Sequence, residues 1–279
     1  MSANPTKYQL GHSDEEMKRL EYQAGVFRPL TERLLRAAGL RPGMRVLDVG
    51  CGVGDVSFLI AELVGPSGEV VGIDGAALPL EWARRRAREQ GLSQVRFEHH
   101  DLASLPRERP FDAVVERLVL VHQGEPLRFI HQMGEHLRPG GVLVCHEFDF
   151  TQQPVAYPPM PLLEQVSDWL TRAVRGMALR AQLGRELAAL LREAGLQVEG
   201  GQSAGVLGVD GEEDADSLRV FSAGIRALLP AIERLGITRA EDVGIDTLEQ
   251  RLRDEARAAN GLFVPFTMIG VWARRPAST

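Results

Sequence analysis

The feature that most constrains the fold is a Gly-rich turn that follows a short apolar run. The run Arg45–Val49 is followed by Gly50, Gly52 and Gly54 at every second position, and residues 56–63 then take helical spacing. Glycine is needed where φ is positive or where a ligand must approach the backbone. The amides of such a turn, and of the helix after it, favour a carboxylate or a phosphate. A strand, a glycine turn and a helix in this order predict a nucleotide-type ligand site.

Short apolar runs alternate with helical patterns through the first half of the chain. Further strands are predicted at residues 69–74, 94–98, 111–115 and 142–146, and further helices at residues 78–90 and 126–137. Strands and helices that alternate at this spacing are joined by right-handed crossovers into a mostly parallel sheet. The pattern predicts a doubly wound α/β fold.

The alternation ends near residue 150, where prolines predict a non-helical connector. Beyond it we predict helices at residues 160–180, 183–194, 216–236 and 247–259, and strands within 196–209 and 267–273. We interpret the extra helices as a cap over the ligand site. Residues 12–38 also have helical spacing, and Pro29 is expected to split them into two helices. The predicted organisation is an N-terminal helical lid at 1–42, a Rossmann-like core at 43–150, and the remaining strands with a helical substrate cap at 151–279.

The acidic residues around the turn indicate which ligand it binds. A dinucleotide fingerprint has the spacing G-x-G-x-x-G, whereas this turn has G-x-G-x-G. Asp48 stands two places before the first glycine, where a carboxylate would repel a pyrophosphate and attract an ammonium or a sulfonium. Asp74 ends the second strand, where a carboxylate can accept hydrogen bonds from ribose hydroxyls. Asp101, with Leu102 beside it, follows the third strand, where it can accept a hydrogen bond from an adenine amino group.

The segment from about residue 43 to residue 145 resembles the class I S-adenosylmethionine-dependent methyltransferases. The motifs that carry the resemblance are Val46 to Gly54, Val71-Gly72-Ile73-Asp74, His100-Asp101-Leu102, Phe111 to Val115, and Leu137-Arg138-Pro139-Gly140-Gly141. The final strand, Phe266 to Arg274, resembles the C-terminal antiparallel strand of that family.

The resemblance implies a mostly parallel seven-stranded sheet, S-adenosylmethionine as cofactor and a methyl-transfer reaction. It places the three glycines against the methionine part of the cofactor, Asp74 on the ribose and Asp101 on the adenine. Glu116, just past the fourth strand, stands where the family has a residue near the methionine amino group. The residues that face the methyl acceptor vary in the family and do not transfer to this chain.

Candidate catalytic residues follow the fourth and fifth strands, at the edge where open α/β sheets bind ligands. A hydroxyl acceptor needs a general base, and His122 is the first candidate because an imidazole titrates near neutral pH. His146 and Glu147, at the end of the fifth strand, are the second candidates. Gln23, in the N-terminal segment, is a candidate for binding the cofactor carboxylate. Residues next to His146 include suitable metal-ligand types, but adjacent strand residues point to opposite faces, so no metal site is predicted.

Composition indicates where the protein is located and which kinds of partner it binds. The net charge of −6 argues against a nucleic-acid partner. Two cysteines in 279 residues argue against a disulfide-stapled secreted fold, and no apolar run is long enough to span a membrane. With no signal sequence at the N-terminus, a cytoplasmic protein is expected. A homodimer is left open.

The sequence is compatible with more than one function. The leading hypothesis is O- or N-methylation of a small molecule by direct in-line transfer. The alternatives are methylation of a protein, a peptide or RNA, and a non-catalytic S-adenosylmethionine-binding protein. Base-N methyltransferases of this fold carry an Asn/Asp-Pro-Pro-aromatic motif after the fourth strand, and this chain has Glu116-Arg117-Leu118-Val119 there. The glycine spacing disfavours a NAD-dependent oxidoreductase.

Overall fold

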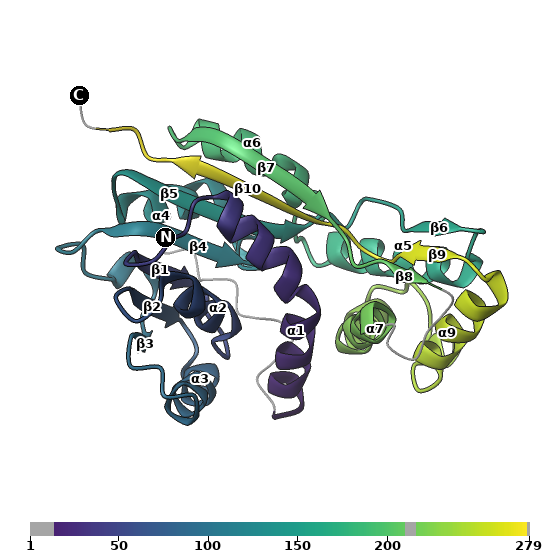
Figure 1. Ribbon diagram of the computed structural model, residues 1–279. Coiled ribbons are helices and arrows are strands. Elements are labelled where there is room, and N and C mark those ends of the chain that lie inside the picture. Colours follow the sequence, from purple (N-terminus) through teal and green to yellow (C-terminus); the bar gives the residue numbers. More distant parts are fainter. Residues whose placement is uncertain (1–13, 210–215, 278–279) are drawn as a thin grey trace. The chain divides into compact units, whose positions relative to one another are not determined.

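The chain forms two compact units, and each is described by itself. The computed structural model describes residues 14–209 and 216–277 (Figure 1). Unit 1 comprises Met1–Glu147, Gly184–Gln202 and Ile269–Thr279, and unit 2 comprises Phe148–Leu183 and Ser203–Met268. Residues 1–13 of the predicted lid lie outside the described part of the chain. No helix in the described residues is both long enough and apolar enough to cross a membrane.

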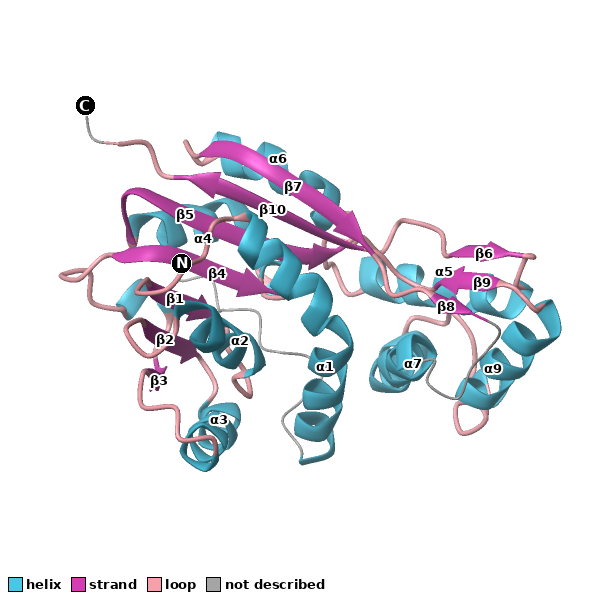
Figure 2. Ribbon diagram, in the orientation of Figure 1, coloured by secondary structure: helices cyan, strands magenta, loops and turns pink. Residues whose placement is uncertain are grey.

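Unit 1 is built on a seven-stranded sheet with the strand order β3-β2-β1-β4-β5-β10-β7 (Figure 2). Its strands are β1 (Arg45–Val49), β2 (Glu69–Asp74), β3 (Val95–His99), β4 (Phe111–Arg117), β5 (Leu137–Phe148), β7 (Gln197–Ala204) and β10 (Met268–Arg274). Strands β1 to β5 pair in parallel with their neighbours. The predicted mostly parallel seven-stranded sheet is confirmed. The strand order reverses between β1 and β4, which is the switch point where such sheets bind ligands.

Strand β10 is antiparallel to β5. The amide of Gly140 donates to the carbonyl of Arg275 at 2.9 Å, and the amide of Asp149 donates to the carbonyl of Thr267 at 3.3 Å. The numbering of the two bonded pairs runs in opposite directions, as antiparallel strands require. The predicted C-terminal antiparallel strand is therefore present.

The helices of unit 1 are α1 (Asp14–Ala37), α2 (Asp55–Val64), α3 (Ala77–Glu89), α4 (Pro126–Glu135) and α6 (Leu183–Glu193). Helices α1 and α2 pack on one face of the sheet, where their apolar side chains form one core with those of β1, β4 and β5. The buried members of that core include Leu34, Leu35, Leu59, Ile60, Val46, Val115 and Val144. Helix α1 and helix α2, which begins directly after the Gly-rich turn, therefore cover the same face of the sheet.

Helix α1 corrects one sequence prediction. The helix is continuous through Pro29, so the expected split into two helices is wrong. A proline in a helix removes one backbone hydrogen bond and strains the preceding turn. Phe27, Leu34 and Leu35 on either side of it are fully buried. Burying a side chain of this size contributes about 1.5–3 kcal/mol, so the shared apolar face outweighs the local cost of the proline.

Strand β5 is longer than predicted. It begins at Leu137, five residues before the expected start, and includes the Pro139-Gly140-Gly141 segment. The pairing with β4 shifts register between Phe111 and Ala113, where the extra residues are accommodated as an irregularity. Helix α4 consequently ends at Glu135 instead of Leu137.

Unit 2 consists of helices and a small antiparallel sheet. Its helices are α5 (Pro161–Gly176), α7 (Asp216–Arg234), α8 (Ala240–Val243) and α9 (Leu248–Ala259), and its sheet has the order β6-β9-β8, with β6 (Val155–Tyr157), β8 (Gly208–Val209) and β9 (Leu262–Val264). The predicted helices are present, whereas β6 and β9 were not predicted. The core of the unit is apolar and includes Leu163, Trp169, Phe221, Ile225 and Phe263.

Candidate functional site

The Gly-rich turn leaves β1 at the switch point of the sheet. Gly50, Gly52 and Gly54 have φ values of +66°, +53° and +92°, which other residues rarely adopt. A Cβ atom at Gly50 would collide with the side chain of Val119, and one at Gly54 would lie 2.9 Å from the ring of Phe58. A Cβ atom at Gly52 would meet no atom within 4 Å. The outer glycines therefore allow close packing, and the middle one borders open space that a ligand can fill.

Asp74 ties the turn to the end of β2. Its Oδ2 atom accepts a hydrogen bond from the amide of Gly52 at 2.9 Å, and its Oδ1 atom accepts one from the amide of Ala76 at 2.8 Å. The Oδ1 atom of Asp101 lies 3.2 Å from the Cβ position that a side chain at Gly75 would have. The structure thus brings together the ends of β1, β2 and β3, as predicted for the glycines and the two aspartates. Leu102, next to Asp101, is buried.

Asp48 is buried on β1, two residues before the turn. Its Oδ2 atom accepts a hydrogen bond from Ser57 Oγ at 2.5 Å. Burial, together with the neighbouring carboxylates, raises the pKa of Asp48 to about 7, against the opposing effects of Ser57 and Arg117. At neutral pH this carboxyl is therefore balanced between its two protonation states, and a nearby cation would favour the ionised form.

Thr31, Arg117 and His146 form a polar cluster on the face of the sheet that α1 covers. Arg117 and His146 are paired across β4 and β5. Arg117 Nη1 donates to Thr31 Oγ1 at 3.3 Å, and His146 Nδ1 lies 3.4 Å from the same oxygen. Burial, and then the charge of Arg117, lower the pKa of His146 to about 3. An imidazole with so low a pKa is neutral but a weak proton acceptor, which weighs against its predicted role as a base.

Glu116 and Glu147 lie on the opposite face of the sheet, because adjacent strand residues alternate. Glu116 Oε2 accepts the amides of Val119 at 3.1 Å and Leu120 at 3.4 Å, and its Oε1 atom accepts the amide of His146 at 3.2 Å. Burial raises the pKa of Glu116 to about 7. This carboxyl, predicted near the methionine amino group, holds the backbone of the loop after β4.

His122 ends a single 3₁₀ turn, Leu120–His122, in that loop. Its amide donates to the carbonyl of Val119 at 3.1 Å. Burial lowers the pKa of His122, so the imidazole is neutral at neutral pH, the form that a general base requires. The loop is placed against the Gly-rich turn through Val119. His122 therefore remains the first candidate for a base.

Gln23 lies on α1 in the described part of the predicted lid. Its Oε1 atom accepts a hydrogen bond from Arg19 Nη1 at 2.8 Å, and Arg19 also forms an ion pair with Glu16 at 2.7 Å. A bonded Oε1 atom leaves the amide nitrogen of Gln23 as the group suited to a carboxylate.

Sequence reasoning missed several polar residues of the site. Ser57 donates a hydrogen bond to Asp48, and the charge of Arg117 acts on both Asp48 and His146. Arg117 carried a positional signal, because it lies just past the fourth predicted strand at the ligand-binding edge. Ser57 had none, since its contact with Asp48 depends on how α2 packs. Within the described residues, no three His, Cys, Asp or Glu side chains converge as metal ligands do.

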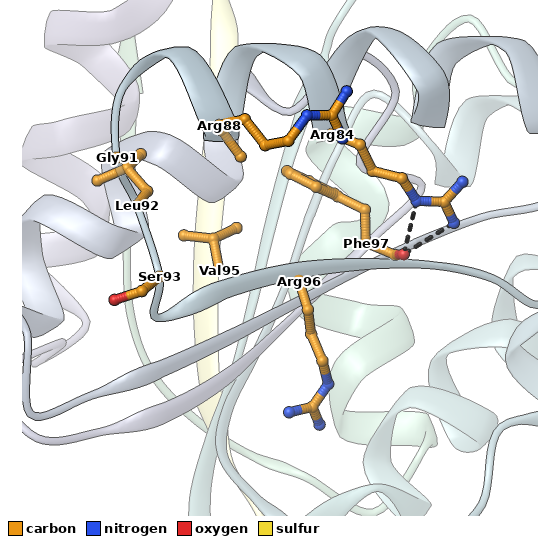
Figure 3. Close-up of a pocket in the computed structure, with 9 residues that line it drawn as sticks. Arg84, Arg88, Gly91, Leu92, Ser93, Val95, Arg96 and Phe97 are labelled. Atoms are coloured by element: carbon orange, nitrogen blue, oxygen red, sulfur yellow. Dashed lines mark hydrogen bonds between the residues drawn. The ribbon is translucent and has the colours of Figure 1, made fainter.

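A surface hollow of about 480 Å³ lies between α3 and β3 (Figure 3). Arg88, Leu92, Val95 and Phe97 are among its lining residues. The guanidinium of Arg84 is bonded to the carbonyl of Phe97 at 2.9 and 3.1 Å, as the dashed lines show. None of the predicted site residues lines this hollow, so it is distinct from the predicted cofactor site.

A family model described as a methyltransferase domain matches residues 40–195, which is more than half of the chain. An uncharacterised 37.1 kDa protein in a Streptomyces fradiae transposon is 37% identical over 167 residues, covering 59% of this chain and 47% of that protein. Demethylmenaquinone methyltransferase of Staphylococcus aureus is 34% identical over 136 residues, covering 48% of this chain and 53% of that enzyme. The chain therefore spans about half the length of these curated relatives.

Solved structures share the fold. A methyltransferase-like protein from Bacillus halodurans has a TM-score of 0.57 at 19% identity, covering 88% of this chain and 99% of that one. The [4+2]-cyclase SpnF has a TM-score of 0.56 at 24% identity, covering 90% and 81% respectively. At these identities the likeness shows the fold alone.

Proposed function

Because this chain belongs to the methyltransferase domain family, we propose that it transfers a methyl group from S-adenosylmethionine to a small-molecule acceptor. The observation that carries the proposal is the turn itself. Gly52 borders open space, and Asp74 fixes its amide at the switch point of the sheet. A bound nucleoside-type cofactor would therefore meet backbone amides, a ribose-binding carboxylate and the nearby Asp101.

The cofactor contacts are proposed residue by residue. Gly50, Gly52 and Gly54 border the methionine part and Asp74 binds the ribose. Asp101 and Leu102 bind the adenine, with a carboxylate for its amino group and a buried apolar side chain for its ring. For the charged end of the cofactor, Asp48 and Glu116 favour the ammonium and Gln23 binds the carboxylate. The raised pKa of Asp48 supports its part, since a carboxyl balanced near pH 7 gains most from a cation beside it.

The cofactor, when bound, supplies a methyl group already activated on a sulfonium. The protein must then align the acceptor, exclude water and, for a hydroxyl acceptor, remove a proton. We assign the proton to the neutral imidazole of His122, which lies in the loop packed against Gly50. An amine acceptor that arrives unprotonated needs alignment alone.

The acceptor class is proposed to be a small apolar molecule that is methylated on oxygen or nitrogen. The Staphylococcus aureus relative is by name a demethylmenaquinone methyltransferase, which supports a small-molecule acceptor. The predicted substrate cap stays a proposal, carried by helices α5, α7 and α9.

A second candidate is a cofactor-binding protein that transfers no methyl group. The fold itself leaves this candidate open, because the [4+2]-cyclase SpnF shares it. Methylation of a protein, a peptide or RNA is the third candidate, and strongly salt-dependent RNA binding would support it.

The proposal is tested by calorimetric titration of the purified protein. We expect micromolar binding of S-adenosylmethionine and S-adenosylhomocysteine, weak or no binding of NADH, and a loss of affinity of at least about tenfold in Asp74→Ala, because two hydrogen bonds that shape the turn are removed. Asp112→Ala, which lies near the opposite end of the sheet at the start of β4, is the control. Binding of NADH alone would overturn the proposal.

Acceptors are then screened by mass spectrometry with wild-type protein and His122→Ala. With a hydroxyl acceptor, His122→Ala should lower turnover about 100-fold or more while its affinity for S-adenosylhomocysteine stays within threefold. Unchanged turnover would remove His122 from the mechanism. Cofactor binding with no methylated product from any acceptor class would favour the non-catalytic candidate.

A further inference from the structure

Glu116 and Glu147 are diagonal neighbours on one face of the sheet. Glu116 is paired with Cys145 across β4 and β5, and Glu147 stands two residues further along β5 on the same face. Both side chains are fully buried. The two carboxyl groups interact, because the charge of Glu116 raises the pKa of Glu147. Two carboxyls in contact away from water cannot both be ionised without strong repulsion.

The hydrogen-bond partners indicate where a proton resides. Glu116 accepts three backbone amides, which suits an ionised carboxylate. Glu147 accepts the amide of Val121 at 3.2 Å, and its Oε2 atom is buried with no hydrogen-bond partner among the described residues. A proton on Glu147 would be donated to Glu116 and would remove that deficit.

The electrostatic setting agrees with this geometry. Burial raises the pKa of Glu147 well above its usual value, and the charge of Glu116 raises it further. Cys145, on the same face of β5, interacts with both acids, and burial raises the pKa of its thiol, which is therefore neutral. The hydrogen bonds described above to the two acids come from backbone amides of the loop and of β5. One negative charge, centred on Glu116, is therefore held by amide donors.

Three of the amides that the two acids accept belong to successive loop residues, Val119, Leu120 and Val121, and the fourth is that of His146 on β5. The loop is also strained at Leu118, whose φ of +60° is rare for a branched side chain. Val119 fills the space beside Gly50. The two acids are thus the groups that hold this loop against the Gly-rich turn, with His122 at its end.

We propose that Glu116 and Glu147 form an acid pair with one shared proton, and that this acid pair positions residues 118–122 beside the Gly-rich turn. Glu147 acts as a positioning residue, and Glu116 holds the loop in addition to the cofactor contact proposed above. Their effect on cofactor binding and on His122 rests on the proposed function, whereas the shared proton does not.

The first test compares three variants by calorimetric titration with S-adenosylhomocysteine. Glu147→Gln keeps a neutral group that can donate to Glu116 and accept from Val121, so its affinity should stay within about threefold of wild type. Glu147→Ala leaves Glu116 and the Val121 amide without that partner and should bind at least about tenfold more weakly. Glu116→Gln replaces the acceptor of three amides by a side chain with one acceptor oxygen, and should bind at least as weakly as Glu147→Ala.

The second test needs no ligand and measures the free energy of unfolding against pH. A carboxyl whose pKa is raised by folding binds a proton more tightly in the folded state, so its contribution is full below pH 4 and is lost as pH rises through the folded pKa. Between pH 5 and 8 the wild-type protein should therefore lose stability relative to Glu147→Gln. Glu164→Gln, the same change at an exposed site on α5, should follow the wild type.

The outcomes separate the two proposals. Identical pH slopes in wild type and Glu147→Gln, or wild-type affinity in Glu147→Ala, would overturn the acid pair. A wild-type protein that binds no S-adenosylhomocysteine would overturn the proposed function, and the pH series would still test the shared proton.

Discussion

The two units of the chain differ in what they bury. Unit 1 buries four carboxyls, those of Glu16, Asp48, Glu116 and Glu147, and two imidazoles, those of His136 and His146. Glu16 lies on α1, whereas the other three carboxyls and His146 stand at or near the carboxyl ends of β1, β4 and β5. The buried polar residues of unit 2 are Asp149, Arg253 and three serines, and they surround no comparable cluster of strand ends.

The units also differ at the surface. Apart from Leu78, all the large hydrophobic side chains that the described residues expose lie in unit 2: Val155, Tyr157, Leu207, Val209, Leu235 and Leu262. Most of them belong to the small sheet or its flanks. Burying an ionisable group costs stability, so such groups persist where a function requires them. Apolar packing, by contrast, tolerates many substitutions. Unit 1 therefore carries most of the buried ionisable groups, and unit 2 carries most of the exposed apolar side chains.

The sharpest way to test this contrast is Gly52→Ala. Its methyl group would occupy the open space that we assign to the cofactor, so affinity for S-adenosylhomocysteine should fall by about 100-fold or more, or about 3 kcal/mol. Gly91→Ala is the matched control, because Gly91 also has a positive φ, of +66°, and its Cβ would meet no atom within 4 Å. Both variants should lose similar stability by chemical denaturation, and only Gly52→Ala should lose binding. Equal affinities in the two variants would break the contrast.

The second test creates a large cavity in the core of unit 2. Phe263 is fully buried in its core, and Phe263→Ala should lower the free energy of unfolding of that unit by about 3–5 kcal/mol. The affinity for S-adenosylhomocysteine should change by less than about threefold, since the proposed contacts lie in unit 1. Leu262→Ala, at the exposed neighbouring position, should change stability by about 0.5 kcal/mol or less. A matching loss of cofactor affinity in Phe263→Ala would show that packing in unit 2 also shapes the site.

The smallest expected effect concerns His146. Its pKa is lowered to about 3 in the folded state, so the unfolded chain binds the extra proton between that value and about 6.5. This residue makes stability rise with pH in that window and level off above it. His146→Leu should remove about 2 kcal/mol of the difference between pH 5 and pH 7, as measured by denaturation at each pH. An unchanged pH dependence would mean that His146 is not held neutral by burial.

The sequence allowed the regular part of unit 1 to be predicted. Apolar runs such as Val46–Val49 and Val70–Ile73 are buried on both faces and enter turns directly, which makes parallel strands easy to recognise. Strand β6, by contrast, has only three residues, and two of them are exposed, so no pattern marks it. The sequence did not predict a continuous α1, because the usual effect of a proline at Pro29 is outweighed by the packing of α1 against strands that lie far away in the sequence.

The sequence predicts those residues of the candidate site whose places follow from the ends of predicted strands. The glycines and Asp74 follow from their places at strand ends. The contact between Glu116 and Glu147 depends on the register of β4 and β5, which the sequence alone does not determine. The pKa shifts that result from such contacts could therefore not be predicted before the register of β4 and β5 was known.

The division of the chain affects how this protein can change over evolutionary time. The path passes between the units four times, after Glu147, Leu183, Gln202 and Met268. A single recombination point therefore cannot exchange either unit intact, because every cut leaves part of one fold on each fragment. A change to unit 2 alone would have to arise by substitutions within residues 148–183 and 203–268, or by two coordinated replacements. We expect lineages of this protein to diversify by gradual drift in those segments and not by domain shuffling.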